Sequence, residues 1–480
     1  MALMFDTHVQ KMKYDVLRGV ARLAYDDQLT PQNLMQLPNV IIPEGKPHFR
    51  CCIYKERAII GERIAMALGG NPEKKAMVEV LPIACDECPV DGIQVSNACR
   101  GCLAHRCKDV CPKDAITIVN LKAQIDKSKC VECGRCVVSC PYSAIIKQTR
   151  PCVNACHAGA ISMNPATQKA VINEEKCVSC GACVYQCPFG AITDKSEITE
   201  VIELLKQSEN NQKYHVYAVV APAMASQYPD CAPEQLVSAI RALGFYRVEE
   251  AAWGADMVAY LEAQEVAEKG MLTSSCCPAF VSYVQKNFPQ LAEYVSQTIS
   301  PMAQISKWIR DADPGCRVVF IGPCIAKKGE VRYTKAREYV DNAITFEEMQ
   351  ALFSVRKIRV EEMEKSAFDH ASYYGRSFAR CGGLAEAVEQ VLKELEIAPE
   401  EFELRALSCD GLVECRTALL KASKGVLQEN FIEGMACEGG CIGGPGCLSH
   451  SARSLARVKA YSRAAPDQTI TESVQALEQL

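Results

Sequence analysis

The sequence predicts a chain in two parts: an α/β domain in the second half, preceded by small α+β repeats. From about residue 214, apolar runs typical of buried strands alternate with helix-like segments, which favours a parallel sheet covered by helices. Between residues 85 and 187, cysteine runs recur with a period of roughly 30 to 50 residues, which indicates an internal repeat. The two ends of the chain have helical patterns and few motifs.

The expected organisation follows these changes of pattern. We expect a mostly helical N-terminal segment at 1–80, cysteine repeats at 81–150 and 151–200, the α/β domain at 213–448, and a helical tail at 449–480. Helices are expected at 16–25 and 57–68, with an irregular stretch at 31–47 between them. In the α/β part, strands are expected at 214–220, 246–251, 272–275 and 317–321, and helices at 233–243, 254–269 and 279–287.

Composition narrows the class of protein. The chain has 480 residues, 49% of them hydrophobic and 23% charged, which is ordinary for a globular protein. A net charge of −5 gives no case for nucleic acid, and no 18-residue apolar stretch predicts a membrane span. The N-terminus shows no signal peptide, so the 29 cysteines point to a reduced, cytoplasmic protein with metal clusters rather than a disulfide scaffold.

Two complete cysteine motifs occupy the first repeat region. Cys99, Cys102, Cys107 and Cys111 give C-x2-C-x4-C-x3-C-P, and Cys130, Cys133, Cys136 and Cys140 give C-x2-C-x2-C-x3-C-P. Three closely spaced thiolates can hold three corners of a 4Fe–4S cube, while the cysteine before proline ligates the neighbouring cube. We therefore expect one cluster on Cys99, Cys102, Cys107 and Cys140, and another on Cys130, Cys133, Cys136 and Cys111.

A third and a fourth cluster are expected further along. Cys177, Cys180, Cys183 and Cys187 repeat the second spacing, and Cys156 stands in the fourth-ligand position of a degenerate unit, so it completes a cluster with the first three of these. The remaining cysteines of the region could hold a fourth cube: Cys85, Cys88, Cys152 and Cys187. The alternative is that Cys85 and Cys88 are structural.

Three later cysteine motifs resemble the signature loops of iron-only (FeFe) hydrogenases. They read Thr273-Ser274-Ser275-Cys276-Cys277-Pro278, Gly322-Pro323-Cys324-Ile325-Ala326-Lys327-Lys328-Gly329-Glu330 and Met435-Ala436-Cys437-Glu438-Gly439-Gly440-Cys441. They occur in the family's order, over roughly residues 214–447, with the ferredoxin repeats in their usual N-terminal place. The Pro-Ala-Phe after the first loop resembles the group B type.

The resemblance implies a fold of two α/β lobes around an H-cluster, a 4Fe–4S cube joined to a two-iron subsite with CO, cyanide and a bridging dithiolate. It implies that Cys277, Cys324, Cys437 and Cys441 ligate the cube and that Cys441 bridges to the two-iron subsite. Cys276 would then relay protons, Lys327 would hydrogen-bond a cyanide, and Met435 would pack beside the two-iron subsite.

A proton route is also implied. Glu262 and Glu265 lie three apart on an expected helix, so they share a face, and they match the family's relay glutamates. Ser296 matches the relay serine, and Lys269 stands where an arginine often closes the outer end. The alternative for such a glutamate pair is a solvated helix face.

The sequence departs from the family prototypes around the cofactor. Gly322 stands where methionine is usual, Met302 where glutamine is common, and Ala223 where serine is found. These changes imply one smaller wall of the pocket and fewer hydrogen bonds to the cofactor, which would tune its potential. Cys447 follows the glycine-rich loop and is either a spare thiol or a protective ligand.

The other cysteines and histidines are interpreted conservatively. Cys51 and Cys52 are adjacent and are expected to be packing thiols, and five cysteines without ligand spacing are expected in the core: Cys231, Cys316, Cys381, Cys409 and Cys415. His105 and His157 lie inside the cluster loops, where a hydrogen bond or solvent exposure is commoner than ligation.

The resulting hypothesis is a cytoplasmic, ferredoxin-type FeFe hydrogenase of anaerobic hydrogen metabolism. By resemblance, H2 and protons would be its substrates, a soluble ferredoxin or similar carrier its electron partner, and maturation proteins the source of its two-iron subsite. Three alternatives are a hydrogenase-like iron–sulfur assembly factor, an H2 sensor and a polyferredoxin. Lys327 and the relay glutamates argue against the first.

Overall fold

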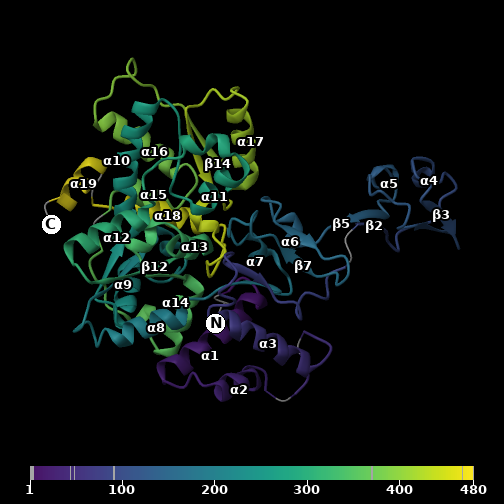
Figure 1. Ribbon diagram of the computed structural model, residues 1–480, viewed down its shortest axis with the longest axis horizontal. Helices are drawn as coiled ribbons and strands as arrows, with labels where there is room; N and C mark the ends of the chain where they lie inside the picture. The colour runs from purple at the N-terminus through teal and green to yellow at the C-terminus, as the bar shows by residue number, and fades with distance from the viewer. Residues whose placement is uncertain are drawn as a thin grey trace.

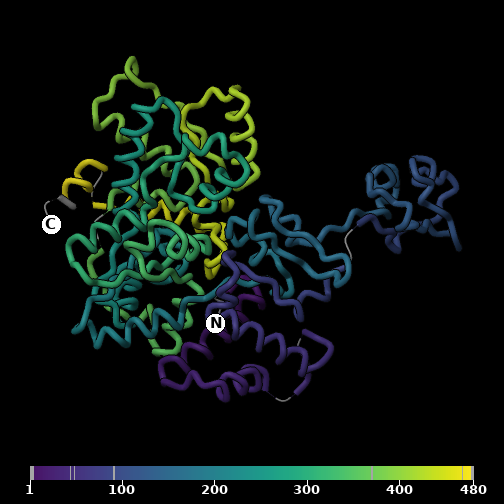
Figure 2. Tube along the Cα trace, viewed as in Figure 1, coloured from purple at the N-terminus to yellow at the C-terminus, as the bar shows by residue number. Residues whose placement is uncertain are grey.

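The computed structural model describes residues 5–43, 45–47, 49–89, 92–368, 371–466 and 469–478. Most of the chain forms one large body, and residues 92–148 form a small unit that projects from it (Figure 1; Figure 2). Among the described residues, no helix is both long and apolar enough to cross a membrane.

Three helices begin the chain and cover one edge of the body: α1 (His8–Tyr25), α2 (Pro31–Ile41) and α3 (Ile53–Ala67). The irregular stretch expected at 31–47 is wrong over its first part, because α2 occupies it. The Thr30 side chain accepts a hydrogen bond from the Asn33 N–H and Pro31 opens the helix, which together favour a helix start. Helix α1 packs against α3 and also against two helices of the second half, α8 (Ile198–Gln207) and α14 (Phe346–Val355).

The cysteine repeats form two similar units, one inserted in the other. The outer unit contains β2 (Gly92–Val95), α4 (Arg106–Asp109), β3 (Ile116–Val119), β4 (Lys122–Ile125), α5 (Arg135–Ser139) and β5 (Ile145–Gln148). The inner unit contains β1 (Val78–Val80), α6 (Pro151–Asn154), β6 (Ile161–Met163), β7 (Ala170–Ile172), α7 (Ala182–Gln186) and β8 (Ile192–Asp194).

Strand pairing defines this nesting. In the inner unit, β1 pairs antiparallel with β8, so a strand before the outer unit is joined to one after it. In the outer unit, β2 pairs antiparallel with β5, and Gly92 lies opposite Gln148. The outer unit therefore leaves and re-enters the inner unit at neighbouring points. The sequence predicted one repeat region at 81–150 and a second at 151–200. Because β1 pairs with β8, we propose instead that residues 78–89 belong to the inner unit, together with the second region.

The second half contains two parallel sheets, which form the two lobes. One sheet has the order β10-β9-β12-β13. Its strands are β9 (Val216–Val220), β10 (Arg247–Glu250), β12 (Arg317–Gly322) and β13 (Asn342–Thr345). The other has the order β11-β15-β14, with strands β11 (Leu272–Thr273), β14 (Ala406–Asp410) and β15 (Phe431–Met435). Strand β9 is buried throughout because helices cover both faces of its sheet.

The helices of the lobes follow their strands. They are α8 and α14 (above), α9 (Pro233–Ala242), α10 (Ala251–Lys269), α11 (Pro278–Asn287), α12 (Pro301–Ala312), α13 (Ile325–Tyr333), α15 (Tyr373–Ser377), α16 (Gly383–Glu394), α17 (Gly411–Ser423), α18 (Ser454–Arg463) and α19 (Ile470–Glu478). Five short 3-10 turns are η1 (Pro222–Ser226), η2 (Pro289–Tyr294), η3 (Lys335–Glu338), η4 (Val360–Glu362) and η5 (Gly440–Gly443). The helical tail expected after residue 449 is present as α18 and α19.

Helix α10 links the two lobes, since it packs on both α12 and α16. Gly254 permits its close approach to α12: a Cβ at this position would lie 2.1 Å from the Pro301 carbonyl oxygen. Any side chain there would push the helices apart, so the lobe arrangement depends on this glycine.

Candidate metal centres and active site

Two cavities in the outer unit are each lined by four cysteines. One contains Cys99, Cys102, Cys107 and Cys140, and the other contains Cys111, Cys130, Cys133 and Cys136. These are the two sets expected from the sequence, with the cysteine before proline contributed by the opposite motif. His105 lines the first cavity.

The inner unit brings together two further sets. The pKa of the Cys183 thiol is well above its usual value, first because of burial and then because Cys180, Cys177 and Cys156 lie close by. Burial, followed by the thiols of Cys187, Cys85 and Cys88, raises the pKa of Cys152 to about 11. The fourth set of cysteines is therefore brought together in the fold, as the third set is.

A recurring hydrogen bond relates all four sets. The fourth cysteine of each motif precedes a proline, or His157 in the case of Cys156. In each case its sulfur accepts a hydrogen bond from the backbone N–H four residues later. The four acceptors, with their distances, are Cys111 (3.3 Å), Cys140 (3.3 Å), Cys156 (3.2 Å) and Cys187 (3.2 Å). Cys99 and Cys85 accept from the N–H groups of Ala123 and Ala170, at 3.4 and 3.3 Å. Cys85 thus has in the inner unit the place that Cys99 has in the outer unit.

The second-half motifs place four more cysteines around one point. Cys277 and Cys324 are the N-cap residues of α11 and α13, so both lie at helix N-termini, whose partial positive charge favours an anionic group. Cys437 follows β15 and Cys441 lies in η5. Burial raises the pKa of Cys437 well above its usual value, and the thiols of Cys324, Cys277, Cys180 and Cys441 raise it further.

The glycine-rich loop closes on neighbouring backbone. Gly440 has φ +82°, and a Cβ there would lie 2.6 Å from the Cys381 nitrogen. A Cβ on Gly444 would lie 2.8 Å from Pro323 of the second loop, and one on Gly443 would lie 1.9 Å from the Glu438 carbonyl oxygen. Larger residues cannot occupy these positions without moving the loop, so the glycines hold Cys437 and Cys441 in place.

The inner unit abuts this centre. Pro445 packs on Gly181, which follows Cys180: a Cβ on Gly181 would lie 2.5 Å from the Pro445 ring. The pKa of Cys180 is raised to about 12, mainly by burial and to a smaller extent by nearby thiols that include Cys277. Pro445 therefore lies at the contact between the third cysteine set and the second-half centre.

Lys327 and Lys328 lie side by side on α13 but point into different surroundings. Lys327 Nζ lies 2.7 Å from a Glu330 carboxylate oxygen and donates to the Cys276 carbonyl at 3.5 Å. Burial lowers the pKa of Lys327, but the Glu330 carboxylate outweighs this, so the net pKa is raised and the ammonium group stays charged. A fixed cation thus lies beside Cys276.

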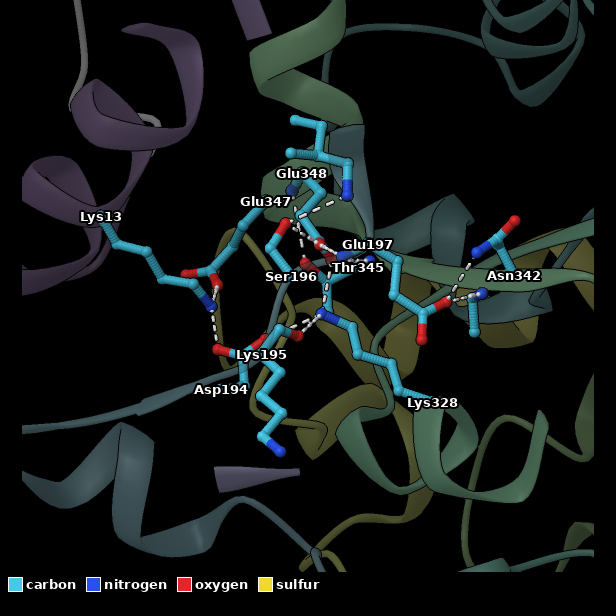
Figure 3. A network of polar contacts seen from close by, with 12 residues as sticks. Lys13, Asp194, Lys195, Ser196, Glu197, Lys328, Asn342, Thr345, Glu347 and Glu348 are labelled. Atoms are coloured by element: carbon cyan, nitrogen blue, oxygen red, sulfur yellow. Dashed lines mark hydrogen bonds and ion pairs between the residues drawn. The ribbon is translucent and has the colours of Figure 1, made fainter. Parts of the chain in front are cut away.

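Lys328 joins a buried ionic network that Figure 3 shows. Its Nζ lies 2.9 Å from Asp194 Oδ2 and 2.8 Å from Glu348 Oε2. Asp194 also pairs with Lys13 of α1, whose Nζ lies 2.6 Å from Glu347 Oε2. Burial would raise the pKa of Asp194, but the two ammonium groups hold it well below its usual range. The network ties α1, the end of β8 and α14 to the helix that carries Lys327.

Four residues expected on the proton route form a connected series. Lys269 Nζ lies 2.6 Å from Glu265 Oε1, and the Ser296 hydroxyl donates to Glu265 Oε2 at 2.7 Å. Ser296 also lies close enough to Glu262 to affect the pKa of its carboxyl. Glu262 Oε1 accepts from the N–H and hydroxyl of Ser275, at 3.0 and 2.9 Å. The series runs from a partly exposed lysine to the residue that precedes Cys276.

Glu262 is the buried centre of this series. It has no exposed surface, and burial raises the pKa of its carboxyl to about 7. Within the described residues, its Oε2 atom has no hydrogen-bond partner. This oxygen can therefore carry a proton near neutral pH. Cys276 is buried as well, and Glu262 is one of the groups that raise the pKa of its thiol.

Comparison with known proteins identifies the second half. The family model described as "Iron only hydrogenase large subunit, C-terminal domain" matches residues 214–445. A 4Fe–4S dicluster domain matches 147–191 and a 4Fe–4S binding domain matches 122–145. Residues 214–445 of this chain therefore form an iron-only hydrogenase C-terminal domain. The resemblance seen in the three cysteine loops and the expected α/β fold after ferredoxin-like repeats are thereby confirmed.

Relatives of the hydrogenase family match over most of the chain. Iron hydrogenase 1 of Clostridium pasteurianum is 27% identical over 412 residues, covering 74% of this chain and 70% of the relative. The periplasmic Fe hydrogenase large subunit of Nitratidesulfovibrio vulgaris is 25% identical, covering 70% of this chain and 90% of the relative. A solved FeFe-hydrogenase structure from Chlamydomonas reinhardtii is 20% identical with a TM-score of 0.48, covering 58% of this chain and 93% of that one.

Of the residues that differ from the hydrogenase prototypes, Gly322 has a structural explanation. The space beside Gly322 is filled by Phe320, whose ring would lie 2.6 Å from a Cβ on Gly322. A larger residue at 322 is therefore excluded by a neighbour in the same strand. Met302, Ala223 and Met435 are all buried, and Met435 ends β15 in the same apolar cluster as Cys276.

Some cysteines lie where the sequence did not place them. The expectation that Cys51 and Cys52 are packing thiols is wrong for Cys51, which is exposed. The reason is that both precede α3 in a surface turn, with their sulfur atoms 3.9 Å apart. Cys447 is fully buried and its thiol donates to the Ile442 carbonyl at 3.5 Å. Cys316, Cys409 and Cys415 are buried as expected, whereas Cys231 and Cys381 are half-buried.

Sequence reasoning missed three residues of the site. Ser275 provides both hydrogen bonds to Glu262, and Glu330 provides the partner of Lys327. Phe280 packs on Gly434, where a Cβ would lie 2.3 Å from its ring. Both Ser275 and Glu330 lie within the signature loops, so their position beside named residues was the available signal.

His157 lines a cavity together with Cys180 and Cys437.

Proposed function

We propose that this chain is an FeFe hydrogenase that catalyses the reversible oxidation of H2 to two protons and two electrons. One observation carries the proposal: Cys277, Cys324, Cys437 and Cys441 converge beside a buried, charged Lys327 and the inner end of a proton series. A simple electron-transfer protein would need the thiols but neither the cation nor the buried carboxyl.

The donor set fits an H-cluster. Four half-buried cysteines, two of them at helix N-termini, suit a 4Fe–4S cube, and the loop glycines let the backbone approach it closely. Cys441 would share its sulfur with the two-iron subsite, and Lys327 would donate to an anionic cyanide ligand. When bound, this group supplies the redox chemistry at which H2 is split or formed.

The protein's own residues move the proton. Burial raises the pKa of Glu262 to about 7, so its carboxyl can accept and release a proton near neutral pH. Ser296 connects it to Glu265 and Lys269 at the surface, and Cys276 completes the route toward the cofactor. Met435, which is buried in the same apolar cluster as Cys276, would pack beside the two-iron subsite.

Electrons would travel through the four ferredoxin-type clusters. The third cysteine set contacts the H-cluster loops through Cys180 and Pro445, so it is the entry point to the active site. We propose a ferredoxin-type carrier as the outer partner, maturation proteins as the source of the two-iron subsite, and a reducing cytoplasm as the compartment. The direction of turnover is a separate property of the cluster potentials.

Infrared spectroscopy tests the proposal. Holoprotein matured with its two-iron subsite should show stretching bands of CO and cyanide and should turn over H2. Protein that binds its iron–sulfur clusters but lacks these bands would instead support the assembly-factor alternative. Bands without appreciable turnover would support the sensor alternative.

Cys276→Ala separates the proton relay from cofactor binding. The variant should keep the CO and cyanide bands and lose about a hundredfold or more of its turnover, because the last proton carrier is missing. Cys316→Ala removes a buried thiol from a different apolar cluster than that of Cys276 and is the matched control, expected to keep its turnover. Equal activity in the two variants would contradict the assignment of Cys276.

A further inference from the structure

The outer unit differs in charge from the rest of the chain. Residues 92–148 contain nine Lys and Arg against four Asp and Glu, a net charge of +5, while the whole chain carries −5. The remaining residues therefore carry −10. All nine basic side chains are exposed: Arg100, Arg106, Lys108, Lys113, Lys122, Lys127, Lys129, Arg135 and Lys147. The unit that projects from the body is thus a basic module on an acidic protein (Figure 1; Figure 2).

A surface groove on this unit reaches the second cysteine set. The groove has a volume of about 750 Å³ and runs between α4 and α5, with Cys111 and Cys133 in its wall. Cys133 is exposed, unlike the cysteines around the H-cluster site, which are buried or half-buried. An electron leaving the chain can therefore depart at this groove with little protein between the cluster and a partner.

The rim of the groove has the composition of a docking surface. Val138 lines it and is 90% exposed, so an apolar contact is available without rearrangement. Its charged lining residues are Arg135 and Asp109, and exposed Lys108 and Lys113, which flank the lining residues in the sequence, make the surroundings basic. An apolar centre within a polar, charged rim is typical of protein–protein interfaces, and the net positive field favours an acidic partner.

We propose that this groove docks a small acidic iron–sulfur electron carrier. The proposal rests on the hydrogenase function and names the place and charge of its electron partner. One electron passes from the reduced carrier's cluster to the cluster of Cys111, Cys130, Cys133 and Cys136, or back during H2 oxidation; no proton moves in this step. The acidic body would repel the same carrier, so the basic unit also directs it away from other surfaces.

Charge reversal at the rim tests the proposal. With an acidic two-cluster bacterial ferredoxin as the probe, the Arg135→Glu holoenzyme should show a KM about tenfold higher at low ionic strength. The difference should shrink as salt is added, because exposed charges are screened. Turnover with reduced methyl viologen, a small dye that does not need the groove, should stay unchanged.

A matched control and a second variant sharpen the result. Lys307→Glu makes the same reversal at an exposed position of α12, on the side of the body away from the outer unit (Figure 1). It should leave the KM for the ferredoxin nearly unchanged. Val138→Glu places a new negative charge at the groove itself and should raise that KM as Arg135→Glu does. Its side chain is already in solvent, so folding should be intact.

The outcomes are distinguishable from failure of the hydrogenase function. If the wild type turns over with viologen but Arg135→Glu and Lys307→Glu have the same KM for the ferredoxin, the docking proposal is overturned. Binding of the basic unit to anionic phospholipid vesicles, with no salt-dependent effect on the ferredoxin KM, would also overturn it. An enzyme inactive with viologen would count against the hydrogenase function itself.

Discussion

Glu262 shows how burial prepares a single side chain for proton transfer. It lies on α10 with no exposed surface, holds two hydrogen bonds from Ser275 at one oxygen, and has none at the other among the described residues. Burial penalises the carboxylate, so the pKa rises from its ordinary 4.5 to about 7. At the outer end of the series, Glu265 is paired with Lys269.

Glu262→Gln should change both activity and the pH dependence of stability. The pKa of Glu262 is higher in the folded than in the unfolded state. The contribution of this carboxyl to the free energy of unfolding is therefore fully present below about pH 4.5 and is lost as the pH rises through about 7. The loss is about 3 kcal/mol when complete. The neutral variant should therefore gain thermal stability over wild type at pH 8, have little advantage at pH 5, and turn over far more slowly at both.

Thermal unfolding of the two holoproteins at the same scan rate measures this effect. Glu389→Gln, an exposed position on α16, is the control and should show no pH-dependent difference from wild type. A Glu262→Gln protein that is less stable than wild type at pH 8 would contradict a raised pKa for Glu262.

At the scale of elements, α13 serves the active site and the domain contact at once. Its N-cap is Cys324, Lys327 faces Cys276, and Lys328 enters the network of Asp194, Glu348 and Lys13 (Figure 3). The acid partners come from β8, the last strand of the inner unit, and from α14. The helix that carries Lys327 is thereby fixed against the inner unit.

Lys328→Met should destabilise the protein strongly. The methionine leaves Asp194 and Glu348 buried with one cation fewer, and breaking a buried ion pair costs about 3 to 5 kcal/mol. Lys11→Met removes a partly exposed pair with Asp15 on α1, and should cost under about 1 kcal/mol. Unfolding midpoints of the two holoproteins compare them directly. Similar midpoints would show that the network does not stabilise the contact.

At the scale of the whole molecule, much of the chain could be predicted from its sequence. Short-range spacing specifies which thiols share a cluster, and strand–helix alternation specifies the parallel sheets. The nesting of the two ferredoxin-type units was not predictable, because the β1–β8 pairing joins strands more than a hundred residues apart. The contact of Pro445 with Gly181 also depends on packing between segments that no local pattern relates. The pair of Lys327 and Glu330 is different, because the two residues lie three apart on α13 and helical spacing alone brings them together.

The nesting leads to a final prediction. Gly92 and Gln148 are paired in adjacent strands, so a two-residue glycine linker can replace residues 92–148 and still join the inner unit. The shortened protein should lose about eight iron atoms, the content of two 4Fe–4S clusters, and keep its H-cluster infrared bands and its turnover with methyl viologen. Turnover with an acidic ferredoxin should fall steeply, because the basic groove and its exposed cluster are gone. Iron analysis and the two assays measure this, with Arg135→Glu as a control that keeps its iron. Loss of about sixteen iron atoms, or of the infrared bands, would instead mean that the inner clusters depend on the outer unit for folding.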